Sequence, residues 1–335
     1  MSSSIDLSQV AAEGLGLMNF TWRPEPVSKE TAFGVMQEAI KINLPKKTFF
    51  NGGEFYGANN INLEYIRDFF AQYPELRQHV IVSIKGAIGA NLIPNPTTEG
   101  IANSIDNIIK YIPDLDIFEP ARLSKQVPFE ETAAALDSAI DAGKIKAYTL
   151  SECSGDSLEQ FAKIAKHKPV GAEVEFSLFT REIADNGVAK VAGELDVPII
   201  AYSPLSRGFL SGEIKTKSDI PEGDMRHHLG RFSEENIKKN RVVVEELAKI
   251  AEKRGVTSAQ LALAWLKYHS GKTINGIKYP KIIPIPSSSS IGRVQENFAK
   301  VTLSDEEFST IQTLLDGNAV HGHRYTPQVD AFLSV

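Results

Sequence analysis

Two polar residues beside apolar stretches have the types and spacing of a proton-donating pair. Lys85 closes the apolar run that starts at Val80, and an ammonium in that position needs either a partner or a function. Tyr56 lies in the polar segment NGGEFYG, which follows the preceding apolar run. A cation beside a phenol lowers the pKa of the tyrosine, so the pair could protonate a carbonyl oxygen. The spacing alone also allows a tyrosine packed on a rim and a lysine that reaches solvent.

Eight short apolar runs alternate with longer stretches of helical periodicity, which predicts repeated βα units around a parallel sheet. Because each run can find two neighbours without a reversal of strand order, a closed barrel explains them better than an open sheet. We therefore expect an α/β protein with one (β/α)8 TIM barrel, a single domain over residues 1–335. The predicted strands are 14–18, 48–51, 80–85, 115–118, 147–151, 172–176, 198–202 and 282–285, and the predicted helices are 29–43, 62–72, 99–110, 130–142, 156–167, 182–195 and 234–268.

The chain beyond the last predicted strand carries two further helices, at 292–299 and 304–315. Ser304 with Glu307 has the spacing of a capping box, and Gly255 with Thr257 divides the long helical stretch before them. Residues 318–335 lack a helical period, so we expect a loop-like tail over the mouth of the barrel.

Composition excludes several classes of protein. The chain has 42% hydrophobic and 23% charged residues and a net charge of −6, which argues against disorder and against a nucleic-acid partner. Its one cysteine, Cys153, cannot form an intrachain disulfide and suits a reducing compartment. The N-terminal segment lacks the pattern of a signal peptide, and no apolar stretch is long enough to span a membrane. We expect a cytoplasmic enzyme with no membrane partner and no metal.

Several predicted strand ends together resemble the aldo-keto reductase family over nearly the whole chain. The matching segments are NGGEFYG, SIKG, TLSECS, VEFSLFTR, AYSPLSRGFLSG and IPIPSSSSIGRVQENF. The resemblance implies a (β/α)8 barrel that binds NADPH without a Rossmann fingerprint, and the sequence has no such glycine motif opening a βαβ unit. It also implies that an aldehyde is reduced to an alcohol.

Two positions depart from the family's catalytic pattern. Tyr56 and Lys85 match the proton donor and its lysine neighbour, but Asn51 stands where the family usually has aspartate. The family's substrate-orienting histidine falls on Ala121, next to Arg122, or on Glu119 if the alignment slips by two residues. We therefore expect Lys85 to lack an anionic partner and to depress the pKa of Tyr56 further, with Arg122 or Glu119 contacting the carbonyl group.

The cofactor residues implied by the resemblance lie along three stretches. Tyr202 would stack on the nicotinamide, and Ser151, Glu152 and Glu173 would contact its carboxamide, although carboxylates only accept hydrogen bonds. A cation with hydroxyl donors suits a 2′-phosphate, so we expect NADPH rather than NADH. The remaining expected contacts are Ser203, Leu205 and Arg207 along the pyrophosphate, and Ser287, Ser288, Arg293, Glu296 and Asn297 around the adenosine.

The expected substrate contacts are Trp22, Phe118 and Arg122. Within the family, Ala121, Glu152 and a tail reading HGHRY make the pattern most similar to fungal members that reduce pyridoxal, a vitamin B6 aldehyde, to pyridoxine. Two alternatives stay open: an aldehyde and ketone reductase of broad specificity, and a non-catalytic module like the channel β subunits of this family. The sequence leaves the oligomeric state open.

Overall fold

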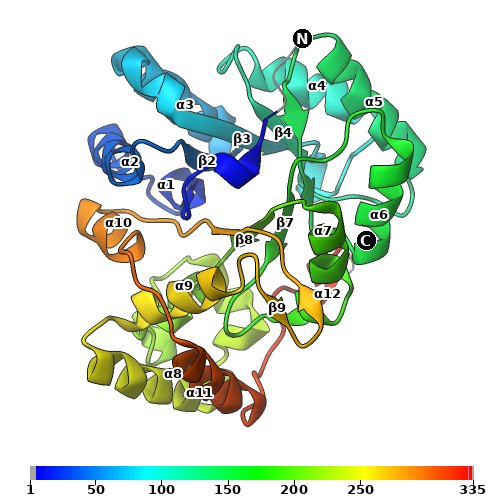
Figure 1. Cartoon of the computed structure of the whole chain (residues 1–335). Coiled ribbons are helices and arrows are strands. Elements are labelled where there is room, and N and C mark those ends of the chain that lie inside the picture. The colour runs from blue at the N-terminus through cyan, green and yellow to red at the C-terminus, as the bar shows by residue number, and fades with distance from the viewer. Residues whose placement is uncertain (1–4, 331, 334–335) are drawn as a thin grey trace.

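Parallel strands form the centre of the molecule and helices surround them (Figure 1). This computed structural model describes residues 5–330, 332 and 333. The strands are β1 (Leu15–Gly16), β2 (Thr48–Gly53), β3 (Val80–Gly86), β4 (Ile117–Pro120), β5 (Ala147–Tyr148), β6 (Leu150–Ser151), β7 (Ala172–Glu175), β8 (Ile199–Tyr202) and β11 (Ile282–Pro284).

The strands close into one barrel, as the sequence predicts. They are hydrogen-bonded in two parallel sets, β1-β2-β3-β4-β5 and β6-β7-β8-β11. Only Thr149 separates β5 from β6, so these two short strands form one stave of the barrel. On the other side, the Gly14 amide donates to the Pro284 carbonyl at 2.9 Å, and Gly16 forms a parallel bridge with Ser287.

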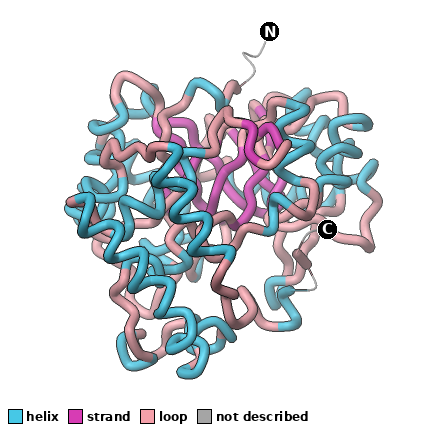
Figure 2. The backbone as a smooth tube through the Cα atoms, turned by 60° about the horizontal axis from the view of Figure 1, so that its bottom comes forward, coloured by secondary structure: helices cyan, strands magenta, loops and turns pink. Residues whose placement is uncertain are grey.

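The helices cover the outside of this barrel (Figure 2). Each predicted helix before residue 182 is present, with ends shifted by no more than three residues. The capping box of Ser304 and Glu307 is confirmed, and so is the N-cap Thr257. The helices are α1 (Met18–Thr21), α2 (Lys29–Asn43), α3 (Ile61–Gln72), α4 (Thr98–Ile108), α5 (Phe129–Asp141), α6 (Gly155–Ile164), α7 (Val188–Leu195), α8 (Glu234–Arg254), α9 (Ser258–Tyr268), α10 (Ile291–Asn297), α11 (Asp305–Asp316) and α12 (Pro327–Asp330).

The fourth strand runs over Ile117–Pro120 instead of 115–118, and three other predicted elements differ more. The first strand ends early, because Met18 already begins α1. The helix expected over 182–195 divides into a 3-10 turn, Glu182–Ala184, and α7, because Gly187 takes a left-handed φ of 84° before α7. The tail, expected as loop, contains the short helix α12.

One hairpin was missed, although the sequence carries its signal. Strands β9 (Thr273–Ile274) and β10 (Ile277–Lys278) pair antiparallel around Asn275 and Gly276. Both turn residues have positive φ, 50° and 80°, which is the conformation of a two-residue type I′ turn. An Asn-Gly pair between β-branched residues is a strong hairpin signal.

The barrel interior changes from apolar to polar along the strands. Apolar side chains fill the part of the interior toward the amino ends of the strands, and Leu7 and Val10 from the N-terminal segment pack against them. Beyond this layer, at the carboxyl ends of the strands, the buried side chains become polar and charged. The apolar layer consists of Phe49, Ile81, Ile117, Ala147, Ile200, Ile283 and Ile285.

Candidate active site

Lys85 lies between two buried carboxylates at the carboxyl end of the barrel. On β3 it is in register with Gly53 of β2 and with Glu119 of β4. Its Nζ lies 2.7 Å from Glu119 Oε1 and also forms an ion pair with Glu173 of β7. The lysine is 5% exposed and the two glutamates 0% and 1%. The expectation that Lys85 lacks an anionic partner is therefore wrong, since two strands other than β2 supply the charge.

Asn51 and Thr149 complete this group, which we call the lysine cluster: Lys85, Asn51, Glu119, Thr149 and Glu173. Lys85 Nζ donates to Asn51 Oδ1 at 3.2 Å, and Asn51 Nδ2 donates to Glu173 Oε2 at 2.7 Å. Thr149 Oγ1 donates to Glu119 Oε2 at 2.6 Å. Glu173, expected at the nicotinamide carboxamide, thus uses both carboxylate oxygens inside the cluster. Glu119, expected at the carbonyl group, is likewise held here.

Tyr56 lies above the lysine cluster. Its ring covers Gly53, the residue in register with Lys85, so closely that a Cβ at position 53 would fall 2.8 Å from ring atoms. Thr21 Oγ1 donates to the Tyr56 carbonyl at 2.7 Å, and the ring centroid of Trp22 is 5.4 Å from that of Tyr56. Tyr56 keeps 7% of its surface exposed. The structure therefore brings three predicted residues, Tyr56, Lys85 and Trp22, together at the carboxyl ends of β2 and β3.

The acidity of Tyr56 differs from the prediction. Burial raises the pKa of Tyr56 well above its ordinary value, and the Lys85 ammonium lowers it only in part. The Glu173 and Glu119 carboxylates add to the increase, because negative charge disfavours a phenolate. Tyr56 is therefore a protonated phenol at neutral pH, as a proton donor must be before it reacts.

The end of β4 contributes Arg122 but not Phe118. Phe118 is fully buried in the cluster of apolar residues between strands and helices, because residues alternate across a strand and its neighbours Ile117 and Glu119 face the interior. The prediction of Phe118 as a substrate contact is wrong for this reason. Arg122 is half-buried, and its Nη1 donates to Ser151 Oγ at 3.2 Å, which brings together two predicted residues.

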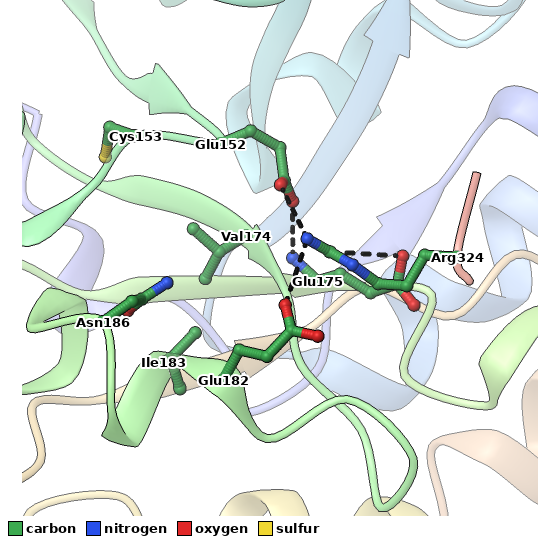
Figure 3. Close-up of a pocket in the computed structure, with 8 residues that line it drawn as sticks. All are labelled: Glu152, Cys153, Val174, Glu175, Glu182, Ile183, Asn186 and Arg324. Atoms are coloured by element: carbon green, nitrogen blue, oxygen red, sulfur yellow. Dashed lines mark hydrogen bonds and ion pairs between the residues drawn. The ribbon is translucent and has the colours of Figure 1, made fainter. Parts of the chain in front are cut away.

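A second group of charged side chains, most of them buried, lies at the carboxyl ends of β6 and β7 (Figure 3). Arg324 of the tail reaches between Glu152 at 3.4 Å, Glu175 at 3.6 Å and Glu182 at 3.3 Å. Glu152, expected at the nicotinamide carboxamide, accepts a bond from the Glu175 amide at 2.9 Å. Burial alone would raise the pKa of Glu152, but the cations of Arg324 and Arg122 bring it below its ordinary range.

Sequence reasoning missed Glu175 and Arg324. Glu173 and Glu175 stand two residues apart on a fully buried strand, a spacing that places both on one face and could have indicated a pair of interior carboxylates. Arg324 has no comparable signal, because its partners are 142 or more positions earlier in the chain.

The same tail segment contacts the residue expected to stack on the nicotinamide. The hydroxyl groups of Tyr202 and Tyr325 are 3.0 Å apart. The Arg207 guanidinium lies 4.4 Å from the centroid of the Tyr325 ring, and its Nη1 donates to the Arg324 carbonyl at 2.6 Å. Arg207, expected along the pyrophosphate, thereby joins the tail to β8.

The loop after β8 has an unusual backbone. Ser203 and Arg207 have φ values of 46° and 55°, in the left-handed region that non-glycine residues rarely adopt. Such conformations cluster at binding and active sites, at about 1–3 kcal/mol each. Leu205, between them, is half-buried.

The predicted adenosine contacts gather around α10. Asn297 Nδ2 donates to the buried Ser288 Oγ at 3.2 Å, while Ser287 lies against Gly16 at the end of β1. Arg293 pairs with Glu296 at 2.8 Å and with Glu213 of the loop after β8. The buried Asn297 Oδ1 has no hydrogen-bond partner among the described residues. An unpaired buried acceptor beside hydroxyl groups and a cation fits a nucleotide that offers a donor and a phosphate.

We expect Arg324→Met to lower the free energy of unfolding by about 3 kcal/mol at neutral pH, because it leaves buried carboxylates without a cation. The stabilisation from Glu152 exists above the ordinary pKa of glutamate and disappears as pH falls through its lowered folded pKa. The difference between variant and parent should therefore shrink on acidification, as urea unfolding carried from pH 7 to well below pH 4 would measure.

Arg181→Met is the matched control, since Arg181 pairs with Asp316 at the surface and should change stability by less than about 1 kcal/mol. Equal losses in both variants, independent of pH, would contradict a buried charge role for Arg324.

Comparisons with known proteins agree with this fold. A Saccharomyces cerevisiae protein provisionally named a pyridoxal reductase is 42% identical over 93% of this chain and 95% of its own length. A Schizosaccharomyces pombe protein with a similar provisional name is 32% identical over 98% of each chain. The crystal structure of a thermostable aldo-keto reductase with the inhibitor epalrestat has a TM-score of 0.66 at 19% identity, covers 91% of this chain and 95% of its own, and shows the same fold. The sequence model of the Aldo/keto reductase family matches residues 14–316, and the chain belongs to that family.

Proposed function

We propose that the protein reduces an aldehyde to an alcohol with NADPH, and that pyridoxal is the aldehyde. The observation that carries this proposal is the placement of Tyr56 above the buried Lys85, at the end of the barrel where catalytic groups of this fold lie. A protonated phenol supported by a nearby ammonium can donate its proton to a carbonyl oxygen as negative charge develops there.

The chain's own residues would divide the reaction between them. When bound, NADPH supplies a hydride to the carbonyl carbon. Tyr56 donates its proton to the carbonyl oxygen, which becomes the alcohol, and the resulting phenolate is stabilised by Lys85 until solvent returns the proton. Tyr202 and Ser151 would orient the nicotinamide, while Trp22 and Tyr56 form an aromatic wall that excludes water from the carbonyl group.

The preference for NADPH rests on the α10 region. Arg293 supplies a cation on α10, the helix whose Asn297 bonds the Ser288 hydroxyl, and a 2′-phosphate is a better partner for a cation with hydroxyl groups than a ribose hydroxyl. Glu296 and Glu213 hold the Arg293 side chain at this position.

Pyridoxal is supported by the names of both fungal relatives and by the side chains around Tyr56. The Trp22 ring can pack against an aromatic aldehyde, and Arg122 offers donors to its polar substituents. Without Phe118, the aromatic side of the site depends on Trp22 together with Phe55, whose ring centroid is 5.7 Å from that of Trp22.

Tyr56→Phe should lower kcat for aldehyde reduction by about 10²–10⁴-fold, because it removes the proton donor. NADPH oxidation followed at 340 nm measures this effect, and cofactor fluorescence should show that NADPH still binds. Tyr148→Phe is the control, because that buried hydroxyl donates to the His167 carbonyl outside the site and should leave kcat within about twofold. Undiminished turnover by Tyr56→Phe would overturn the mechanism, and NADPH binding without turnover by the parent protein would favour a non-catalytic binding module.

The choice of aldehyde has its own test. We expect kcat/KM for pyridoxal to exceed that for benzaldehyde and for 4-nitrobenzaldehyde by about tenfold or more, since polar groups on a substrate that are matched by the site discriminate strongly. Equal values across the panel would replace pyridoxal with a broad range of aldehydes while leaving the reductase activity in place.

Arg293→Gln should raise the KM for NADPH by roughly tenfold and leave the KM for NADH nearly unchanged, because only the former carries the 2′-phosphate. Arg241→Gln is a suitable control, since Arg241 pairs with Glu245 on the outer helix α8. A parallel loss for both cofactors in Arg293→Gln would contradict the proposed phosphate contact.

A further inference from the structure

The lysine cluster holds more carboxyl groups than one ammonium requires. Lys85 faces Glu119 from β4 and Glu173 from β7, and no more than 5% of any of the three is exposed. Two carboxylates around one cation in a buried region repel each other, so this arrangement lowers the stability of the fold. A loss of stability of this kind points to a functional role for the second carboxyl group. Burial first, and then the neighbouring Glu119 carboxylate, raise the pKa of Glu173 above its ordinary value.

The Glu173 carboxylate is held in place by a direct hydrogen bond from the Asn51 side-chain amide. Asn51 on β2 and Glu173 on β7 lie opposite each other in the ring of strands, and the hydrogen bond between them crosses the interior. Both side chains also contact Lys85. Exchanging which of the two carries the carboxylate would keep the number of charges, the hydrogen bond and nearly the same volume.

We propose that Glu173 is a positioning residue of the proton-donor site: together with Glu119 it fixes the Lys85 ammonium beneath Tyr56 and sets the acidity of that phenol, and its charge is interchangeable with a charge at position 51. This inference deepens the function proposed above and rests on it for the role of Tyr56. The two glutamates act through Lys85 and through their charge, and neither has to touch the substrate.

The charged groups around Tyr56 decide the sign of the effect. Lys85 favours the phenolate, whereas Glu173 and Glu119 disfavour it. From other elements, Arg122 after β4 and Tyr325 of the tail also interact electrostatically with Tyr56, and the Cys153 thiol is near enough to Glu119 to be affected by it. Removing one carboxylate from the cluster therefore lowers the pKa of Tyr56, and adding one raises it.

Three variants separate this role from a purely structural one. Glu173→Gln should move the alkaline limb of the kcat/KM profile for aldehyde reduction down by about one pH unit, because Glu173 is ionised above its raised pKa and the variant lacks that anion. Asn51→Asp should move it up, because a third carboxylate is added. The double variant Asn51→Asp with Glu173→Gln should return the limb to within about 0.3 unit of the parent, a recovery that two independent structural defects would not give.

A second readout does not depend on turnover. The tyrosinate absorbance at 295 nm is taken as the difference between each protein and its Tyr56→Phe version. It should titrate at the lowest pH in Glu173→Gln, at a higher and similar pH in the parent and the double variant, and at the highest pH in Asn51→Asp. If this order appears while the parent reduces no aldehyde, the proposed function fails and the positioning role stands.

Glu13→Gln is the matched control for the loss of a buried glutamate. Glu13 is 6% exposed and pairs with Lys267 outside the lysine cluster, so its variant should lose stability without moving the alkaline limb. The proposal is overturned if both single variants shift the limb in the same direction, if the double variant is not restored, or if Glu13→Gln shifts the limb as far as Glu173→Gln.

Discussion

An ammonium buried at the carboxyl ends of the strands constrains much of the structure around it. Lys85 cannot stay charged away from water unless neighbouring strands bring oxygen atoms to it, and they come from β2, β4 and β7. Since β7 is separated from β3 by other strands, only a closed ring of strands places Glu173 against the lysine. Closure of the barrel thus decides which charges surround Lys85, and the Lys85 ammonium in turn affects the pKa of Tyr56.

Strand β7 connects this group to the second set of buried charges. Its two glutamates stand two residues apart: Glu173 faces Lys85, and Glu175 faces Arg207 and Arg324. The tail is therefore held by the strand that also supports Lys85 beneath Tyr56. Tyr325 brings the tail into contact with Tyr202, so changes in tail docking reach both Tyr202 and Tyr56 at the mouth of the barrel.

Sequence reasoning predicted the barrel well because eight apolar runs with helices between them leave few other topologies. It also brought Tyr56, Lys85 and Asn51 together correctly, since residues after neighbouring strands meet at one end of a barrel. The partners of Lys85 were predicted wrongly, because sequence alone does not give the register that sets Glu119 of β4 beside the lysine, and Glu173 reaches it only across the interior. Phe118 failed for a simpler reason: position along a strand was considered without the alternation that sends Phe118 outward and Glu119 inward.

The family match ends at residue 316, whereas Arg324 and Tyr325 lie beyond it. A chain trimmed to the matched boundaries would keep every described strand and every α-helix up to α11 but would leave Glu152 and Glu175 without their tail cation. Expression clones and alignments of related sequences should therefore extend past α11, because the last segment of this chain supplies a cation that pairs with buried carboxylates of the barrel.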